Sequence, residues 1–295
     1  MYLKTIKYFI ALSIGLVSCI SNSPKSNKAI VSTTVLPLQY FIEKIADTLV
    51  DVNVLIPPGA APVSYEPTAD QMIKLSQSSL YFQIGLFGFE KAWTDKLSKQ
   101  SNNLKLISLS EHITPIDAPH HHGHDHGHGH QCQTKDPHIW MSAQNAKLIA
   151  KVIASELSIQ LPNHSDTFKH NLMVLLKEIT AIDSTIKRNL SNERRQFMIY
   201  HPALTYFAHE YGLTQIPIEL DGKEPTAHHL KTIVEQSKNN NSNIIFVQKQ
   251  FDLKNAEVIA KEAKASIVEI DPLNMNWDKE MIRLSEILKT HVPEN

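Results

Sequence analysis

Strand-like and helix-like segments alternate along this sequence, and the alternation occurs once on each side of a single long amphipathic segment. In the first half the strand-like runs are β-branched or alternate between apolar and polar residues, and they cover residues 29–37, 50–56, 80–85 and 104–109. In the second half they cover residues 196–200, 215–219, 243–248 and 265–270. The pattern predicts a fold with parallel α/β packing, and the second half repeats the arrangement of the first.

The long amphipathic segment, residues 164–190, is predicted to be a single helix and is the candidate connection between two lobes. Its apolar residues recur three and four positions apart, and they are Phe168, Leu172, Leu175, Leu176, Ile179, Ile182 and Ile186. At about 1.5 Å per residue, such a helix can run the length of a small domain. The alternative is an ordinary surface helix within one domain. We expect an N-terminal lobe over residues 29–163 and a C-terminal lobe over residues 191–295.

The N-terminus has the pattern of an exported lipoprotein. Lys4 and Lys7 precede an apolar run over residues 8–17, which is too short to span a bilayer and is typical of a signal peptide. The run ends in Leu-Val-Ser-Cys, which resembles a bacterial lipobox and predicts cleavage after residue 18 and acylation of Cys19. The alternative is a buried cysteine in a first helix. Residues 19–28 are polar and are predicted to be a tether between a lipid anchor at the membrane surface and the folded body.

The overall composition describes a globular protein without a nucleic-acid footprint. The chain has 295 residues, a formal net charge of -1 and 42% hydrophobic residues. This balanced charge provides no basic surface for nucleic acid. The sequence has two cysteines, Cys19 and Cys132. If Cys19 carries lipid, only Cys132 remains, so no intramolecular disulfide can form.

A histidine-rich tract lies in the sequence between the strand-like runs of the first half and those of the second half. Its seven histidines are interspersed with glycines, and they are His120, His121, His122, His124, His126, His128 and His130. The tract has no apolar side chain to bury, and imidazoles are common transition-metal ligands, so we expect a flexible loop that gathers metal. One alternative is a purification tag, although this tract is internal. The other is a solvated loop whose imidazoles bind metal without a biological role.

Three further residues are candidate ligands of an ordered metal site. His201 and Asp271 directly follow strand-like runs, where ligands bind in open α/β sheets, and His138 lies in a loop just before a helix. A proline stands next to each of them and stiffens the backbone. Two imidazoles and a carboxylate form a ligand set that suits zinc and, less selectively, manganese or iron. Taken singly, each histidine could instead be structural, and Asp271 could be a helix cap.

The sequence resembles the cluster A-I (cluster 9) substrate-binding lipoproteins of zinc and manganese ABC importers, the ZnuA-like zinc-binding proteins in particular. The matching segments occur in the expected order between residues 29 and 273. They are Pro57-Pro58-Gly59 with residues 64–68 (Ser-Tyr-Glu-Pro-Thr), the His-rich loop before residues 136–140 (Asp-Pro-His-Ile-Trp), Tyr200-His201-Pro202-Ala203 with Tyr206-Phe207 and residues 211–213, residues 222–225, residues 246–248, and residues 270–273.

The resemblance implies two α/β lobes, each a small, mainly parallel sheet flanked by helices. It also implies that one long rigid helix joins the lobes and that metal is held between them. It places the family's metal ligands on His138, His201 and Asp271. The sequence departs from the family pattern at the first ligand, because Val63 stands where the family usually has a histidine. Water, Glu66 or a histidine of the tract could fill the open fourth position of a zinc site. Glu66 and Glu224 match family positions that are structural or adjacent to the ligands.

The expected function is zinc capture outside the cytoplasmic membrane and delivery to an ABC permease and its ATPase, by a monomer and without catalysis. Imidazole-rich donors favour Zn²⁺ over Mn²⁺, which prefers carboxylate and water oxygens. The alternatives within the family are a manganese- or iron-binding relative and an adhesin. A zinc hydrolase is a further alternative, since three protein ligands and a water also describe a catalytic site, but the sequence contains no HExxH motif. We expect the anchored protein to face the periplasm or the cell exterior.

Overall fold

The computed structural model describes residues 28–62, 65–97, 103–119, 134–191, 196–219, 225–239, 243–251 and 253–290. Several predicted features lie outside these residues. They are the signal peptide, Cys19, the tether up to residue 27, Val63, the seven-histidine tract, Cys132 and Glu224.

Two four-stranded parallel sheets form the framework of the structure. The first has the order β2-β1-β3-β4, and its strands are β1 (Ala29–Thr33), β2 (Val50–Val54), β3 (Leu80–Gln83) and β4 (Lys105–Ser108). The second has the equivalent order β6-β5-β7-β8, with β5 (Gln196–Ile199), β6 (Thr214–Pro217), β7 (Ile244–Gln248) and β8 (Ser266–Ile270). Each strand falls within or overlaps a predicted strand-like run, and the predicted fold class is confirmed.

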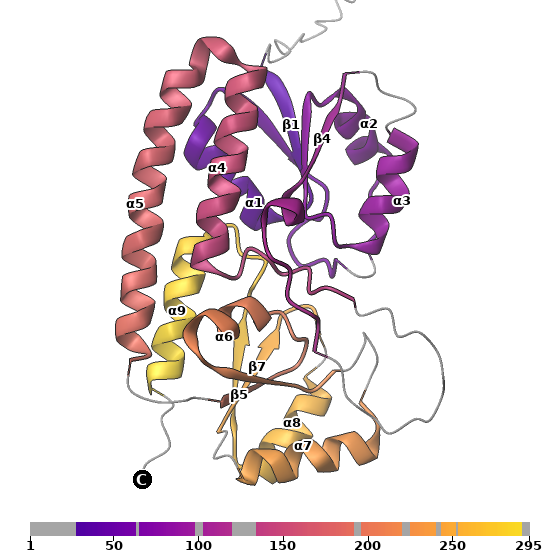
Figure 1. The fold of residues 1–295 in the computed structure, drawn as a ribbon. Helices are drawn as coiled ribbons and strands as arrows, with labels where there is room; N and C mark the ends of the chain where they lie inside the picture. Colours follow the sequence, from indigo (N-terminus) through magenta and orange to yellow (C-terminus); the bar gives the residue numbers. More distant parts are fainter. Residues whose placement is uncertain are drawn as a thin grey trace, which may run out of the picture.

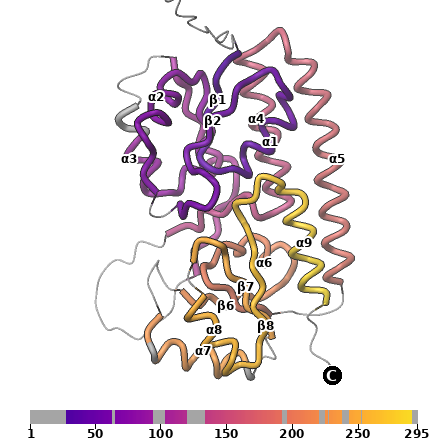
Figure 2. Tube along the Cα trace, turned by 180° about the vertical axis from the view of Figure 1, so that it is seen from behind, coloured from indigo at the N-terminus to yellow at the C-terminus, as the bar shows by residue number. Residues whose placement is uncertain are grey.

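Helices cover both faces of each sheet, as Figures 1 and 2 show. Around the first sheet these are α1 (Leu36–Ala46) and α4 (Ala143–Gln160) on one face and α2 (Ala69–Gln77) and α3 (Gly88–Leu97) on the other. Around the second sheet they are α6 (Thr205–Tyr211), α7 (Ala227–Asn239), α8 (Lys254–Ala263) and α9 (Trp277–Thr290). In the described part of the chain, no helix is both long and apolar enough to cross a membrane.

The long helix α5 (Ser165–Asn189) runs beside both lobes in Figure 1. One stripe of its side chains is buried, and its members are Phe168, Leu175, Ile179, Ile182 and Ile186. This stripe packs against α1 and α4 of the first lobe and α9 of the second. The amphipathic pattern of residues 164–190 therefore forms the joining helix that it predicts.

One apolar core continues from the first lobe into the second. Val31 and Phe82 of the first sheet, Ile199 and Phe246 of the second, and Ile179 of α5 belong to the same buried cluster. Two smaller clusters lie on the outer faces, one between the second sheet and α7 and α8 and one beneath α2 and α3. Most buried apolar side chains of the two lobes therefore belong to one continuous cluster.

The ends of individual helices follow from local hydrogen bonds. Thr68, a predicted N-cap, begins α2 with a capping box, in which its side chain accepts from the Gln71 N–H and the Gln71 side chain accepts from the Thr68 N–H. Gly212 ends α6 in the left-handed region, with φ 67°. Helix α6 begins two residues later than predicted, because the Ala203 N–H bonds back to the His201 carbonyl in a tight turn.

Candidate metal centre

His138 is buried and oriented by its neighbour Asp136. The His138 ring lies in the turn that precedes α4 and is only 6% exposed. One oxygen of Asp136 accepts the His138 backbone N–H at 2.7 Å and lies 2.9 Å from the ring Nδ1. A carboxylate at Nδ1 favours the tautomer with its proton on that nitrogen, so Nε2 is the nitrogen left to bind a metal.

Asp136 remains a carboxylate despite its burial. Burial alone would raise the pKa of Asp136, but attraction to the His138 ring opposes this. Hydrogen bonds from His138 and from the Thr205 side chain add to that attraction, and together they lower the pKa below its usual value. The group that holds His138 is therefore ionised at neutral pH.

His201 follows strand β5 and has an equivalent carboxylate partner in Glu219, which follows strand β6. Both Glu219 oxygens lie 3.3 Å from the His201 Nδ1, and the Glu219 side chain is buried. Gln248, at the end of β7, holds the His201 backbone from both sides. Its Nε2 donates to the His201 carbonyl at 2.6 Å, and its Oε1 accepts the His201 N–H at 3.3 Å. His201 is thus positioned to present Nε2.

The two histidine rings meet at the junction of the lobes. Their centroids are 5.2 Å apart and their planes are 71° apart. Aromatic rings flank the pair, with Trp140 against His138 at 5.4 Å and Phe251 stacked on His201 at 5.4 Å and 20°. These apolar flanks limit the access of water to the rings, His138 more than His201, and lower water content strengthens electrostatic interactions at the site.

Asp271 follows strand β8 and is held by the start of α9. Its N–H donates to Glu280 Oε1 at 2.9 Å, and its Oδ1 accepts the Leu273 N–H at 3.2 Å. Burial raises the pKa of Asp271, and Glu280 raises it further, although Lys249, the Leu273 N–H and Arg283 oppose them. The carboxyl group therefore takes up a proton at a higher pH than an ordinary aspartate.

The described structure brings the two histidines together but does not gather Asp271 into a cluster with them. Strands β5 and β8 are separated by β7, so His201 and Asp271 start from backbones roughly 10 Å apart. No group of three or more His, Cys, Asp or Glu side chains that could hold a metal ion is found among the described residues. Glu66, the predicted substitute ligand, is exposed in the loop ahead of α2.

The carboxylate partners of the histidines were not recognised in the sequence. Asp136 stands in the Asp-Pro-His segment, but nothing local shows that its side chain bonds to His138 rather than to water. Glu219 ends one predicted strand and His201 directly follows another, and these similar positions are the signal that could have paired them. Their contact depends on strands β5 and β6 being neighbours, which only the sheet order reveals.

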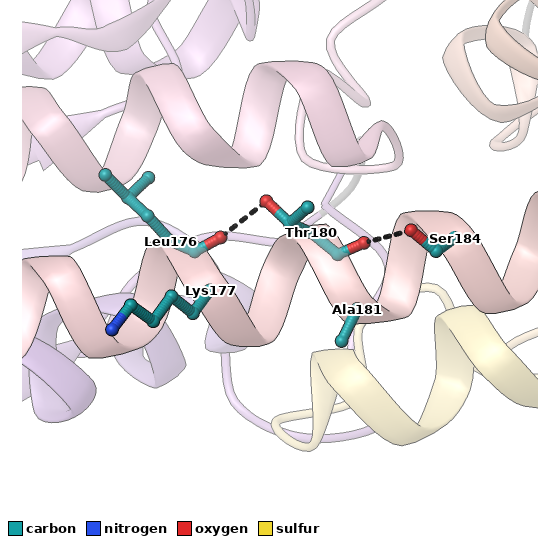
Figure 3. A pocket seen from close by; sticks show the side chains of 5 residues that line it. All are labelled: Leu176, Lys177, Thr180, Ala181 and Ser184. Atoms are coloured by element: carbon teal, nitrogen blue, oxygen red, sulfur yellow. Dashed lines mark hydrogen bonds between the residues drawn. The ribbon is translucent and has the colours of Figure 1, made fainter.

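An open hollow on the outer side of α5 is separate from this centre (Figure 3). It has a volume of about 440 Å³ and is lined by α5 alone, through Leu176, Lys177, Thr180, Ala181 and Ser184. The Thr180 and Ser184 hydroxyls donate to helix carbonyls one turn earlier, so these groups are already bonded. The hollow contains none of the predicted ligands.

Comparison with known proteins places this arrangement in a family. The ZnuA model, described as zinc-uptake complex component A, periplasmic, matches residues 31–284. The chain is 28% identical over 271 residues to the metal ABC transporter substrate-binding lipoprotein FimA of Streptococcus parasanguinis, which covers 88% of this chain and 85% of that protein. It is 26% identical over 272 residues to the manganese ABC transporter substrate-binding lipoprotein PsaA of Streptococcus pneumoniae, with the same coverage of 88% and 85%.

A solved structure agrees with the sequence match. A ZnuA deletion mutant with zinc bound superposes with a TM-score of 0.82 and is 34% identical, covering 91% of this chain and 100% of that one. The family model spans most of the chain and both of its lobes. The protein therefore belongs to the ZnuA family of metal-binding ABC-transporter substrate-binding proteins.

Proposed function

We propose that this protein captures Zn²⁺ between its two lobes and delivers it to an ABC permease. The observation that carries the proposal is the pair of imidazoles at the lobe junction, one buried and one partly buried, each held at Nδ1 by a buried carboxylate. Metal-binding histidines commonly donate their second ring N–H to a carboxylate in this way, which fixes the ring and makes the ligand nitrogen more basic. Such a binding role needs no catalytic base.

The proposed ligands are Nε2 of His138, Nε2 of His201 and the carboxylate of Asp271. Zinc binds imidazole nitrogen at about 2.0–2.1 Å and carboxylate oxygen at about 2.0–2.2 Å. Because Asp271 does not form a cluster with the histidines, we infer that its side chain turns inward when the ion binds. The ion then neutralises a carboxylate whose buried, acidic surroundings disfavour its charge.

The fourth ligand is proposed to come from water or from the histidine-rich tract. Residues on either side of the tract pair with each other, since the Ala118 N–H donates to the Thr134 carbonyl and the Asp136 N–H to the Ile116 carbonyl. The described residues that flank the tract therefore lie side by side, and Asp136 among them contacts His138. This placement supports an auxiliary role for the imidazoles of the tract. One of them would supply the ligand that Val63 cannot, since Val63 stands at the position of the family's usual first histidine.

Replacing all seven histidines of the tract tests this auxiliary role separately. We expect zinc affinity to fall and the number of bound ions to decrease, because surplus donors beside the site have been removed. Competition with a chromophoric chelator measures the first effect and native mass spectrometry the second. An unchanged affinity and stoichiometry, with His138 and His201 intact, would show that the tract takes no part.

Zinc is favoured over manganese by the two imidazole ligands, since manganese prefers oxygen donors. Manganese is the second candidate because PsaA, a relative over most of the chain, is named a manganese-binding lipoprotein. Competition between Zn²⁺ and Mn²⁺ for the purified protein decides between them. Preferential retention of manganese at equal free concentrations would overturn the choice of zinc.

The proposed setting follows from the N-terminal sequence and the family. We propose a monomer made of residues 29–163, the helix 164–190 and residues 191–295, with Cys19 acylated after removal of residues 1–18. The anchored protein faces the periplasm or cell exterior, where it works with an ABC permease and its ATPase. Mass analysis of the membrane form tests the acylation, and Cys19→Ala should release the protein from the membrane.

Metal titration with native mass spectrometry tests the proposed site. We expect wild-type protein to hold one tightly bound zinc ion that His138→Ala and His201→Ala both lose. His209→Ala, which removes an exposed histidine from α6, is the matched control and should keep the ion. Circular dichroism checks that each variant is folded. Retention of the tight ion by both folded variants would rule out the assignment.

A further inference from the structure

Three buried side chains link the segment that carries His138 to the second lobe, and we call them the interlobe tie: Trp140, Tyr206 and Trp277. The Trp140 Nε1 donates to the Pro272 carbonyl at 2.8 Å, and the Trp277 Nε1 donates to the Trp140 carbonyl at 2.8 Å. The Tyr206 hydroxyl donates to the Asp136 carbonyl at 3.0 Å and accepts the Ile116 N–H at 3.2 Å.

Three of the four bonds of the interlobe tie end within two residues of a proposed ligand. Pro272 follows Asp271 directly, and Trp140 is two residues after His138. Asp136, whose carbonyl the Tyr206 hydroxyl reaches, is the residue whose carboxylate orients the His138 ring. The hydrogen bonds of the tie therefore connect the backbones that carry His138 and Asp271 without engaging either ligand side chain, although the Trp140 ring also flanks the His138 ring.

The burial of these side chains makes the connection restrictive. Trp140, Trp277 and Tyr206 are 0%, 1% and 3% exposed. An indole N–H can only donate, so each would lose its partner in a water-free interior if the lobes shifted against each other. The aromatic rings also pack into the apolar core that continues between the lobes. Relative motion of the two ligand-bearing segments is thus opposed by packing and by hydrogen bonding together.

We propose that Trp140, Tyr206 and Trp277 are positioning residues, which hold the backbones of His138 and Asp271 at the spacing that a single zinc ion requires. The proposal rests on the ligand assignment proposed above. With the backbones fixed, capture needs only the inward turn of the Asp271 side chain rather than closure of one lobe on the other. Loss of one tie bond keeps both ligand side chains in the protein but allows the distance between their backbones to vary.

Two conservative substitutions test the interlobe tie. Tyr206→Phe removes one hydroxyl with little change in volume, and Trp277→Phe removes the indole donor. We expect each to weaken zinc binding roughly 10-fold, the scale on which groups that orient metal ligands act. The matched control is Trp93→Phe, because Trp93 of α3 packs against a different core cluster, which is separate from the lobe junction. It should change zinc affinity less than two-fold in the same chelator competition.

A double-mutant cycle separates positioning from general destabilisation. In an Asp271→Ala background the spacing no longer matters, so Trp277→Phe should have almost no further effect on zinc affinity. Equal losses with and without Asp271 would overturn the positioning role. The absorption spectrum of bound Co²⁺ provides a second readout, because its shape follows ligand geometry. We expect Tyr206→Phe to change that spectrum and Trp93→Phe to leave it unaltered.

The outcomes distinguish this proposal from the one on which it rests. If His138→Ala abolishes tight binding while Tyr206→Phe and Trp277→Phe bind as wild type does, the tie is refuted and the zinc site stands. If His138→Ala and His201→Ala keep the tight ion, the ligand assignment fails and the tie fails with it. If Trp277→Phe does not fold, the nearly isosteric Tyr206→Phe decides by its affinity and its Co²⁺ spectrum.

Discussion

At the scale of single residues, the distinctive feature is that two histidines from different lobes each have a buried carboxylate at Nδ1. Asp136 holds His138 and Glu219 holds His201, in each case at Nδ1 and in each case from a buried position. A buried, unpaired carboxylate would be unfavourable, so each imidazole also stabilises the group that orients it. Both Nε2 atoms are left for the same use, and this symmetry is hard to explain if the histidines serve the core alone.

Asp136→Asn should weaken zinc binding by about 10- to 100-fold. The amide can present an N–H to the His138 Nδ1, which favours the tautomer that carries its proton on Nε2. The exposed Asp117, which pairs with Lys135 close by, provides the matched control. Asp117→Asn should bind zinc as wild type does in the same competition assay. Equal affinities for Asp136→Asn and wild type would show that Asp136 does not orient a ligand.

Zinc affinity should depend on pH through Asp271. Burial raises the pKa of Asp271 above its ordinary value of 3.8, so protons compete with the metal at a higher pH than they would at an exposed aspartate. Affinity should therefore fall as pH falls through the acidic range above 3.8. Asp271→Asn removes this contribution, and its affinity should change less steeply over that range. Parallel slopes for the two proteins would contradict a role for the Asp271 carboxylate in binding.

At the scale of elements, the loop after β3 depends on one buried acid and one glycine. Glu90 accepts the backbone N–H groups of Ile84, Gly85 and Phe87, which closes the loop onto the start of α3. Gly85 has φ 84°, and a Cβ there would lie 1.9 Å from the Ser108 Oγ. The position therefore excludes other side chains through its backbone angle and through lack of space.

Gly85→Ala and Gly212→Ala separate these two effects. Both glycines have positive φ, but a Cβ at Gly212 would meet no atom within 4 Å. Gly212→Ala should lower the free energy of unfolding by about 1–2 kcal/mol through backbone strain alone. Gly85→Ala adds overpacking against β4 and should lower it by about 3–4 kcal/mol. Urea denaturation measures both, and equal losses would show that the clash is relieved by a small shift of Ser108.

The positions of the elements were largely predictable from the sequence, whereas some of their boundaries were not. The apolar, β-branched run at residues 29–37 predicts one strand, but β1 ends at Thr33 and α1 begins at Leu36. The pairing of β1 with its neighbouring strands stops at Thr33, and Pro37 fits the first turn of α1. Periodicity could not locate this change, because the same apolar residues suit either element.

At the site, sequence reasoning identified residues at strand ends but not the contacts between them. His201 and Asp271 were singled out because each follows a strand, and the structure places both at the carboxyl edge of the second sheet. The partnership of Glu219 with His201 and the support of Asp271 by Glu280 depend on sheet order and on the docking of α9. Such contacts join distant parts of the chain, and no local pattern encodes them.

At the scale of the whole molecule, the two lobes are joined by far more than α5. The shared apolar core and the interlobe tie cross the same junction. A molecule built in this way should unfold as one cooperative unit rather than lobe by lobe.

Urea denaturation followed by two probes tests this cooperativity. In Trp93→Phe, fluorescence reports only Trp140 and Trp277 at the junction, while far-ultraviolet circular dichroism reports both lobes. The two transitions should coincide, and zinc should shift both to higher urea by mass action. A fluorescence transition clearly earlier than the loss of helix would mean that the junction opens before the lobes unfold.

The central claim is that one zinc ion is bound at the lobe junction by His138, His201 and Asp271. Anomalous diffraction at the zinc absorption edge, from crystals grown with one equivalent of zinc, tests it directly. The account predicts one strong peak about 2.0–2.1 Å from the Nε2 atoms of His138 and His201 and about 2.0–2.2 Å from a carboxylate oxygen of Asp271. A strong peak elsewhere, with the two Nε2 atoms unliganded, would contradict it.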